Sequence, residues 1–263
     1  MCTTLCNMSD FPAHRVVKQP VLRNSPLKNV VCQMTFPEIL GLDSRAVRPI
    51  QIALSSKYPT VGRDQEMKLN VGAQGLVPTG EVRPTFSFRD NAGEWSVTLT
   101  PDSLALETQA YDDFTDFASR WHDVCREVVE TMEISQRDRI GLRYINHIPI
   151  SPEDDLREII QTSLLGVAGE PLGGAKKLIR SFQEVVFEQE DGFVTLRHGL
   201  LNSEGNDTYV LDFDYFSEIH TPLDLQEQDQ TLIDFNHAIF DIFKGSLSKD
   251  AFDSFKPEER KDD

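Results

Sequence analysis

Two carboxylates, two residues apart, are the strongest candidates for chemistry in this sequence. Asp212 and Asp214 lie in the stretch Thr208–Phe216, whose alternation of apolar and polar residues predicts a β-strand. Because successive side chains of a strand point to opposite faces, both carboxylates lie on the same side. Such a pair could hold Mg²⁺, or one member could have a raised pKa and act as a general base.

Basic side chains on other predicted strands could join these carboxylates. Arg143 and His147 share one side of the strand Arg139–Ile148, and Arg197 lies on the strand Phe193–Leu201. The alternative is a solvated strand face on which Asp and Arg form cross-strand ion pairs. A two-metal site would need further carboxylates that the spacing does not supply. We therefore predict ligand-binding residues but no catalytic residue and no metal ligand: Arg143, His147, Asn146, Arg197, Asp212 and Asp214.

Asn146 enters that set because its predicted location is unusual for an amide. By alternation it falls on the same side of its strand as Ile140, Leu142 and Tyr144, the side expected to face the core. A buried amide must find hydrogen-bond partners. It could tie down the strand end before Pro149, or contact a ligand at the sheet edge.

Familiar catalytic and cofactor motifs do not occur in the sequence. The glycine-rich stretch Gly169–Lys177 fails the phosphate-loop pattern, because neither Ser nor Thr follows the lysine and the glycine spacing is wrong. Cys2 and Cys6 have no second Cys/His pair nearby, which argues against a zinc site. Cys32 and Cys125 lie on apolar faces and are expected to be small buried side chains. We expect no cofactor.

Hydrophobic periodicity predicts the elements that must position these residues. The clearest is a helix over Phe114–Met132, in which apolar residues recur at i, i+3, i+4 and i+7. Residues 60–83 are rich in glycine and are expected to form an irregular loop, with a short strand at Met67–Val71. The other predicted strands of the first half are Asn29–Phe36, Thr85–Arg89, Trp95–Thr100 and Leu104–Thr108, with a helix over Arg45–Lys57.

The second half repeats this order of elements. After Arg139–Ile148 we expect a helix from Ser151 to about Leu165, with Ser151 as its N-cap and Pro152 in its first turn. Three strands and a long helix follow. Their ranges are Ile179–Glu188, Phe193–Leu201, Thr208–Phe216 and Leu225–Lys244, with a short last helix near Lys249–Phe255.

Each half therefore reads as strand, helix, three strands and long helix. This order predicts an α+β fold in which two similar β-α-β-β-β-α halves form a mainly antiparallel sheet, with helices on one face. The expected division is an N-terminal arm at residues 1–25, a first half at 26–136, a second half at 137–256 and a charged tail at 257–263. Internal duplication would explain the repeated order.

Charge and composition exclude several classes of protein. The net charge is −17, with nine basic and five acidic residues in 1–80 but 17 basic and 38 acidic residues in 81–263. This acidity argues against a general nucleic-acid binder, since such proteins neutralise phosphates. No apolar run is long enough to cross a bilayer, and residues 1–17 lack the apolar core of a signal peptide. We expect a cytoplasmic protein with no membrane partner.

Three stretches together resemble a known family: Ser25–Pro37, Arg139–Asn146 and Phe235–Asp250. They are similar to a family of uncharacterised, sporadically distributed prokaryotic proteins of about this length. The Gly-Leu-Arg-Tyr-Ile-Asn run that ends at Asn146 is the most specific part. The resemblance implies a single unit from about residue 24 to about residue 256 and an accessory or defence-related role. It carries over no catalytic residues.

Two functions from different classes remain open at this point. The first is a non-enzymatic binding or interaction protein that holds a protein partner or a small ligand, with homodimerisation as one form of partnership. The second is a metal-dependent hydrolase or nuclease that uses Asp212 and Asp214. The sequence favours the first, because it contains no nucleophile, cofactor or metal motif.

Overall fold

Nine β-strands form one antiparallel sheet in the order β3-β4-β5-β6-β2-β8-β11-β10-β9. The computed structural model describes residues 19–72, 75–151, 153–170, 173, 178–203 and 206–258, without the side chains of 66–82, 203 and 206. The strands of this sheet are β2 (Leu27–Thr35), β3 (Thr60–Gly72), β4 (Gly75–Arg89), β5 (Trp95–Thr100), β6 (Ser103–Thr108), β8 (Arg139–Ile150), β9 (Arg180–Gln189), β10 (Gly192–Ser203) and β11 (Asn206–Ser217).

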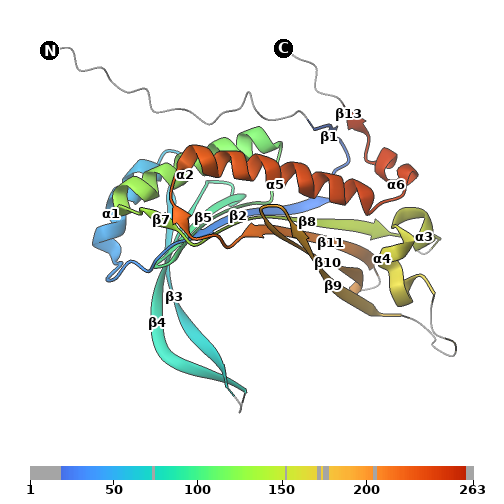
Figure 1. Ribbon diagram of the computed structural model, residues 1–263, viewed down its shortest axis with the longest axis horizontal. Coiled ribbons are helices and arrows are strands. Elements are labelled where there is room, and N and C mark those ends of the chain that lie inside the picture. The colour runs from blue at the N-terminus through green and yellow to red at the C-terminus, as the bar shows by residue number, and fades with distance from the viewer. Residues whose placement is uncertain are drawn as a thin grey trace.

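Helices cover one face of this sheet and leave the other face open (Figure 1). The hairpin β3–β4 projects away from the helices beyond one end of the layer, and β9 forms the edge at the opposite end. The helices are α1 (Ser44–Leu54), α2 (Phe114–Met132), α3 (Leu156–Ile159), α4 (Thr162–Leu165), α5 (Leu225–Gly245) and α6 (Lys249–Ser254), with a 3₁₀ turn η2 (Gly166–Ala168). The face opposite α1, α2 and α5 is called the open face below.

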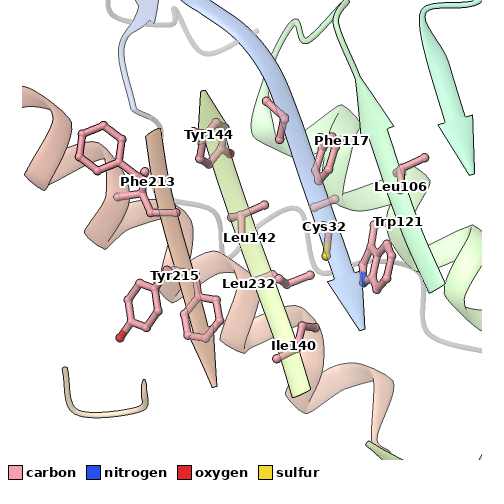
Figure 2. Close-up of a cluster of buried hydrophobic side chains, with 14 of the residues drawn as sticks. Cys32, Leu106, Phe117, Trp121, Ile140, Leu142, Tyr144, Phe213, Tyr215 and Leu232 are labelled. Atoms are coloured by element: carbon pink, nitrogen blue, oxygen red, sulfur yellow. The ribbon is translucent and has the colours of Figure 1, made fainter. Parts of the chain in front are cut away.

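The core lies between the sheet and the long helices. Figure 2 shows Trp121 and Phe117 of α2 beside Cys32 of β2, and Leu142 in the middle of β8. All four side chains are at most 1% exposed. Because α2 places an apolar residue every three or four positions, one side of the helix is covered by the sheet while its charged side stays in water. Asp113 caps this helix by accepting a hydrogen bond from the amide of Asp116.

The two halves of the chain meet at the centre of the sheet, where β2 pairs with β8. Outward from β2 the neighbours are β6, β5, β4 and β3, and outward from β8 they are β11, β10 and β9. In each half the chain leaves the central strand, passes through helical residues and returns strand by strand from the sheet edge. The predicted α+β class, the antiparallel sheet and the helical face are therefore confirmed. The predicted order of three strands in each half is wrong for the first half, where four strands, β3 to β6, lie between α1 and α2.

Two elements differ from the prediction. Residues 60–83 are not an irregular loop, because β3 and β4 pair continuously apart from one irregularity between Met67 and Leu69. The expected helix from Ser151 to Leu165 is broken into α3 and α4. Ile160 between them is extended and bridges to Leu247, so a tertiary contact interrupts the helix. Pro152 lies outside the described residues.

The end of the predicted N-terminal arm pairs with the start of the predicted C-terminal tail. Val21–Leu22 (β1) pairs with Pro257–Glu258 (β13), and Arg23 forms an ion pair of 2.7 Å with Glu258. A second small pair joins β7 (Gln136–Arg137) to β12 (Thr221–Pro222). Residues 1–18, including Cys2 and Cys6, and residues 259–263 lie outside the described part of the chain.

Candidate functional site

Asp212 is engaged by an arginine on the open face. Both its oxygens accept from Arg143 on β8, at 2.8 Å to Nε and 2.6 Å to Nη2. Asp212 is 5% exposed, and this pairing raises the pKa of Arg143. A divalent cation at Asp212 would have to share the carboxylate with a guanidinium. The geometry matches the cross-strand ion pair that the sequence left open as the alternative to a metal or acid–base site.

Asp214 has a different arginine. Arg139 Nη2 lies 3.4 Å from its carboxylate, and the same guanidinium lies 4.7 Å from the ring centre of Phe216. Arg139 reaches this position by crossing Gly141, where an added Cβ would lie 2.7 Å from Nη1. The glycine that opens the Gly-Leu-Arg-Tyr-Ile-Asn run therefore leaves room for this ion pair.

The remaining predicted residues do not converge with the two aspartates. Arg197 lies directly opposite Asp212, but its Nε is 2.7 Å from Glu184 on β9. His147 lies four residues along β8 from Arg143, roughly 13 Å at the usual rise of a strand. Burial lowers the pKa of His147, and Lys28 lowers it further. The open face thus holds a row of paired charges and not one catalytic cluster.

The pairing of Arg143 with Asp212 can be measured as a coupling energy. We expect Asp212→Asn and Arg143→Gln each to destabilise the fold, with a coupling of about 1 kcal/mol in the double variant, because the arginine is partly solvated. Urea denaturation gives the four stabilities. Adding Mg²⁺ is expected to leave the melting temperature of the wild type and of Asp212→Asn equally unchanged. A Mg²⁺-dependent rise confined to the wild type would instead support a metal site.

A cavity of about 530 Å³ lies on the other side of the sheet, within the helix layer. Its walls come from β8, from one face of α5, from the start of α2 and from the segment that precedes β2. This size is typical of pockets that hold small molecules. The residues that line it are Gln19, Pro20, Val21, Leu22, Arg23, Ser25, Leu27, Tyr111, Asp112, Asp113, Phe114, Thr115, Tyr144, Asn146, Asn236, Ile239, Phe240 and Phe243.

Asn146 is the predicted site residue that reaches this cavity. It is 5% exposed, and its Nδ2 donates to the backbone oxygen of Leu211 at 3.2 Å. This bond fixes the orientation of the amide, since only the nitrogen can donate to a carbonyl oxygen. Among the described residues, Oδ1 of Asn146 accepts no hydrogen bond. Asn146 therefore ties β8 to β11, whereas its contact with a ligand stays a prediction and would occur on a central strand and not at the sheet edge.

A chain of hydrogen bonds forms the polar wall beside Asn146. Tyr144 donates to Oδ1 of Asn236 at 2.9 Å, and the hydroxyls of Tyr111 and Tyr144 are 3.3 Å apart. Asn236 in turn donates to Oε1 of Gln19 at 3.1 Å. Burial raises the pKa of Tyr144 well above its usual value, so its hydroxyl stays protonated and able to donate at neutral pH. This wall is held in place by its own contacts.

A β-bulge makes the floor of the cavity apolar. Asn29 pairs with Ile145, but Leu27 pairs with Asn146, so Lys28 is the extra residue of β2. Without the bulge, Lys28 would lie beside Asn146. With it, Leu27 lines the cavity and Lys28 is exposed. The bulge thus keeps a lysine out of the cavity.

Sequence reasoning missed most of the cavity. Tyr144 is expected in the core and is buried there, but the pattern does not predict that its hydroxyl reaches a cavity, and it does not single out Tyr111 or Asn236. The usable signal was Asn236, an amide among the buried apolar residues Phe235 and Ile239 of α5. Asn236, Ile239, Phe240 and Phe243 also follow i, i+3, i+4 and i+7 spacing, which places them on one side of the helix.

Comparison with protein-family models and with curated proteins finds no match to this chain. The resemblance of the three stretches therefore remains a prediction. Within residues 19–258, as far as they are described, no group of three or more His, Cys, Asp or Glu side chains is arranged to hold a metal ion. No helix in that part of the chain is both long and apolar enough to cross a membrane.

Proposed function

We propose that this protein is a binding protein whose cavity between α5, α2 and β8 holds a small molecule. The observation that carries this proposal is the free Oδ1 of the buried Asn146 at the wall of a cavity of about 530 Å³. Oδ1 of Asn146 is not among the described buried atoms that lack a partner, so water reaches it in the free protein. A ligand that donates a hydrogen bond to this oxygen replaces that water, while its apolar part gains from burial in the cavity.

The lining indicates the chemistry of that ligand. Phe114, Phe240 and Phe243 offer aromatic surface, and Asp112 is exposed at the rim with no ion pair among the described residues. Arg23, the only basic lining residue among those described, is paired with Glu258. The ligand is therefore an apolar or aromatic molecule with an amine or amide N–H, and a carboxylate is disfavoured because acceptors and acids would face it.

Three compounds of similar shape test this selectivity: phenethylamine, hydrocinnamide and hydrocinnamate. We expect the amine and the amide to bind with roughly millimolar affinity and the acid not to bind, because only the first two carry N–H donors. The measurement is a titration followed by NMR, observing the side-chain amide signals of Asn146 and Asn236. Equal binding of all three compounds, or of none, would contradict the proposal.

Two variants serve as matched controls. Ile239→Trp fills the cavity from α5 and is expected to abolish binding, whereas Asp212→Asn lies on the open face and is expected to leave it unchanged. Asn146→Leu removes the acceptor while keeping the apolar lining. It should reduce the preference for the amide over the acid more than it reduces binding overall.

The broader predictions remain proposals beside this one. An accessory or defence-related role fits the resemblance of the three stretches, and the cytoplasmic location stays a prediction. The alternative of a metal-dependent hydrolase draws less support, since both oxygens of Asp212 face Arg143. Duplication of an ancestral half stays a proposal: in both halves the chain returns from the sheet edge towards the central strand, but with four strands in the first half and three in the second.

A further inference from the structure

The edge strand β9 carries apolar side chains that the described residues leave exposed. Phe182 is 43% exposed, Val186 is 57% exposed and Phe187 is 39% exposed. In the described part of the chain, β9 pairs with β10 and with no strand on its other side. On its other side, no backbone hydrogen bond joins it to any described residue. Such an edge can pair with another strand, and unprotected apolar edges in proteins are sites of association.

We propose that β9 pairs with β9 of a second copy of this chain, forming a two-fold symmetric dimer whose sheet is continuous across the two copies. Two-fold pairing of an antiparallel edge with itself is the simplest way to close it, because each copy presents the same surface. The proposal concerns a surface remote from the cavity and does not depend on a ligand there.

The residues of β9 select one register for this pairing. When Glu184 lies on the two-fold axis, Phe182 faces Val186 of the partner copy and Arg180 faces Glu188 of the partner copy, each twice. Side chains alternate along β9, so these residues all share one face of the sheet. That face is the open face, because Glu184 pairs with Arg197, which in turn lies opposite Asp212. Shifting the axis by one residue, to Val185, would set Phe182 against Glu188 and Arg180 against Glu190, which lies beyond the end of β9, so the apolar pair would be lost and the charge pair would leave the strand.

The charges agree with this register. Arg180 and Glu188 have no ion pair with any described residue, so both are available to a second copy. The two Glu184 carboxylates would meet at the axis, but each is already 2.7 Å from Nε of Arg197 in its own chain. The arginines thus offset the repulsion between them. A contact made by one strand and its neighbouring side chains is small, so the dimer is expected to be weak and to depend on concentration.

Charge reversal tests the register directly. Sedimentation equilibrium of the full chain should show a concentration-dependent dimer for the wild type. Arg180→Glu and Glu188→Arg should each weaken it about tenfold or more, because like charges then meet twice at the interface. The double variant with both changes should restore the dimer. Mixing the two single variants should give a heterodimer, since each acidic position then meets a basic one.

Each result decides the proposal. A chain that stays monomeric at the highest soluble concentration overturns it, as does a dimer that neither single reversal weakens. A dimer that one reversal weakens but the double variant does not restore rejects the register. Val186→Lys is the second test, because a lysine on the edge should abolish pairing without touching Arg180 or Glu188. Equal melting temperatures of the variants, measured below the dissociation constant, exclude a folding defect.

Discussion

Replacing His122 by leucine is expected to lower the free energy of unfolding by about 3–5 kcal/mol. His122 on α2 lies 2.7 Å through Nδ1 from Oδ2 of Asp229 on α5, and the two side chains are 5% and 1% exposed. Oδ1 of Asp229 already lacks a hydrogen-bond partner among the residues that the structure describes. The substitution therefore leaves a carboxylate in the core with no partner on either oxygen. Urea denaturation at pH 7 gives the measurement.

Removing both partners should cost less than removing one. In His122→Leu with Asp229→Leu, no charge is buried, so we expect the double variant to be more stable than His122→Leu alone. If the double variant is as unstable as the sum of the two single changes, the pair contributes through packing and not through charge.

The same pair predicts a dependence on pH. Burial raises the pKa of Asp229, although the hydrogen bond from His122 lowers it in part. A raised pKa in the folded state favours the protonated form of Asp229. Its contribution to the free energy of unfolding is therefore present at low pH and is lost as pH rises through the pKa of the folded state. In His122→Leu the lowering hydrogen bond is gone. The deficit of this variant relative to the wild type should therefore shrink as pH falls from about 7 towards about 4.

Gly199→Ala is expected to have the second largest effect and to lower the free energy of unfolding by about 1–3 kcal/mol. Gly199 in β10 has φ +157°, which residues with a Cβ rarely adopt, and an added Cβ would fall against the backbone oxygen of Ser181 in β9. Because β10 is the single strand that pairs with β9 among the described residues, the loss of stability should be concentrated in β9. Hydrogen exchange should show faster exchange in the β9 amides, while the β2 and β8 amides keep the protection of the global fold.

Gly245→Ala is the control for this change. Gly245 ends α5, has open space at its Cβ position and has no positive φ, so alanine should be neutral or slightly stabilising. Equal effects of the two substitutions would mean that the close approach of β9 and β10 at Gly199 is not maintained in solution. Gly199→Ala should also weaken the dimer through β9, because it displaces the strand that would pair.

Local patterns predicted elements well where the local signal agreed with the tertiary environment. The helix Phe114–Met132 was predicted with the bounds that it has, because its apolar spacing and its cap at Asp113 specify the same start and the same buried face. The hairpin of β3 and β4 was missed because its glycines favour loops, while its backbone groups are satisfied by a partner strand that local sequence does not identify. The helix after Ser151 failed for the related reason that Leu247 pairs with Ile160.

By itself, the sequence determined which face of each strand every candidate residue occupies, since side chains alternate along a strand. It therefore placed Asp212 and Asp214 together on one face and Asn146 on the other. Only the tertiary structure decided what those faces meet. Cross-strand register brings Arg143 to Asp212, and a bulge at Lys28 brings Leu27 to Asn146. The cavity needs Tyr111, Asn146 and Asn236, which lie far apart in the chain, because packing joins surfaces whose neighbours no local pattern specifies.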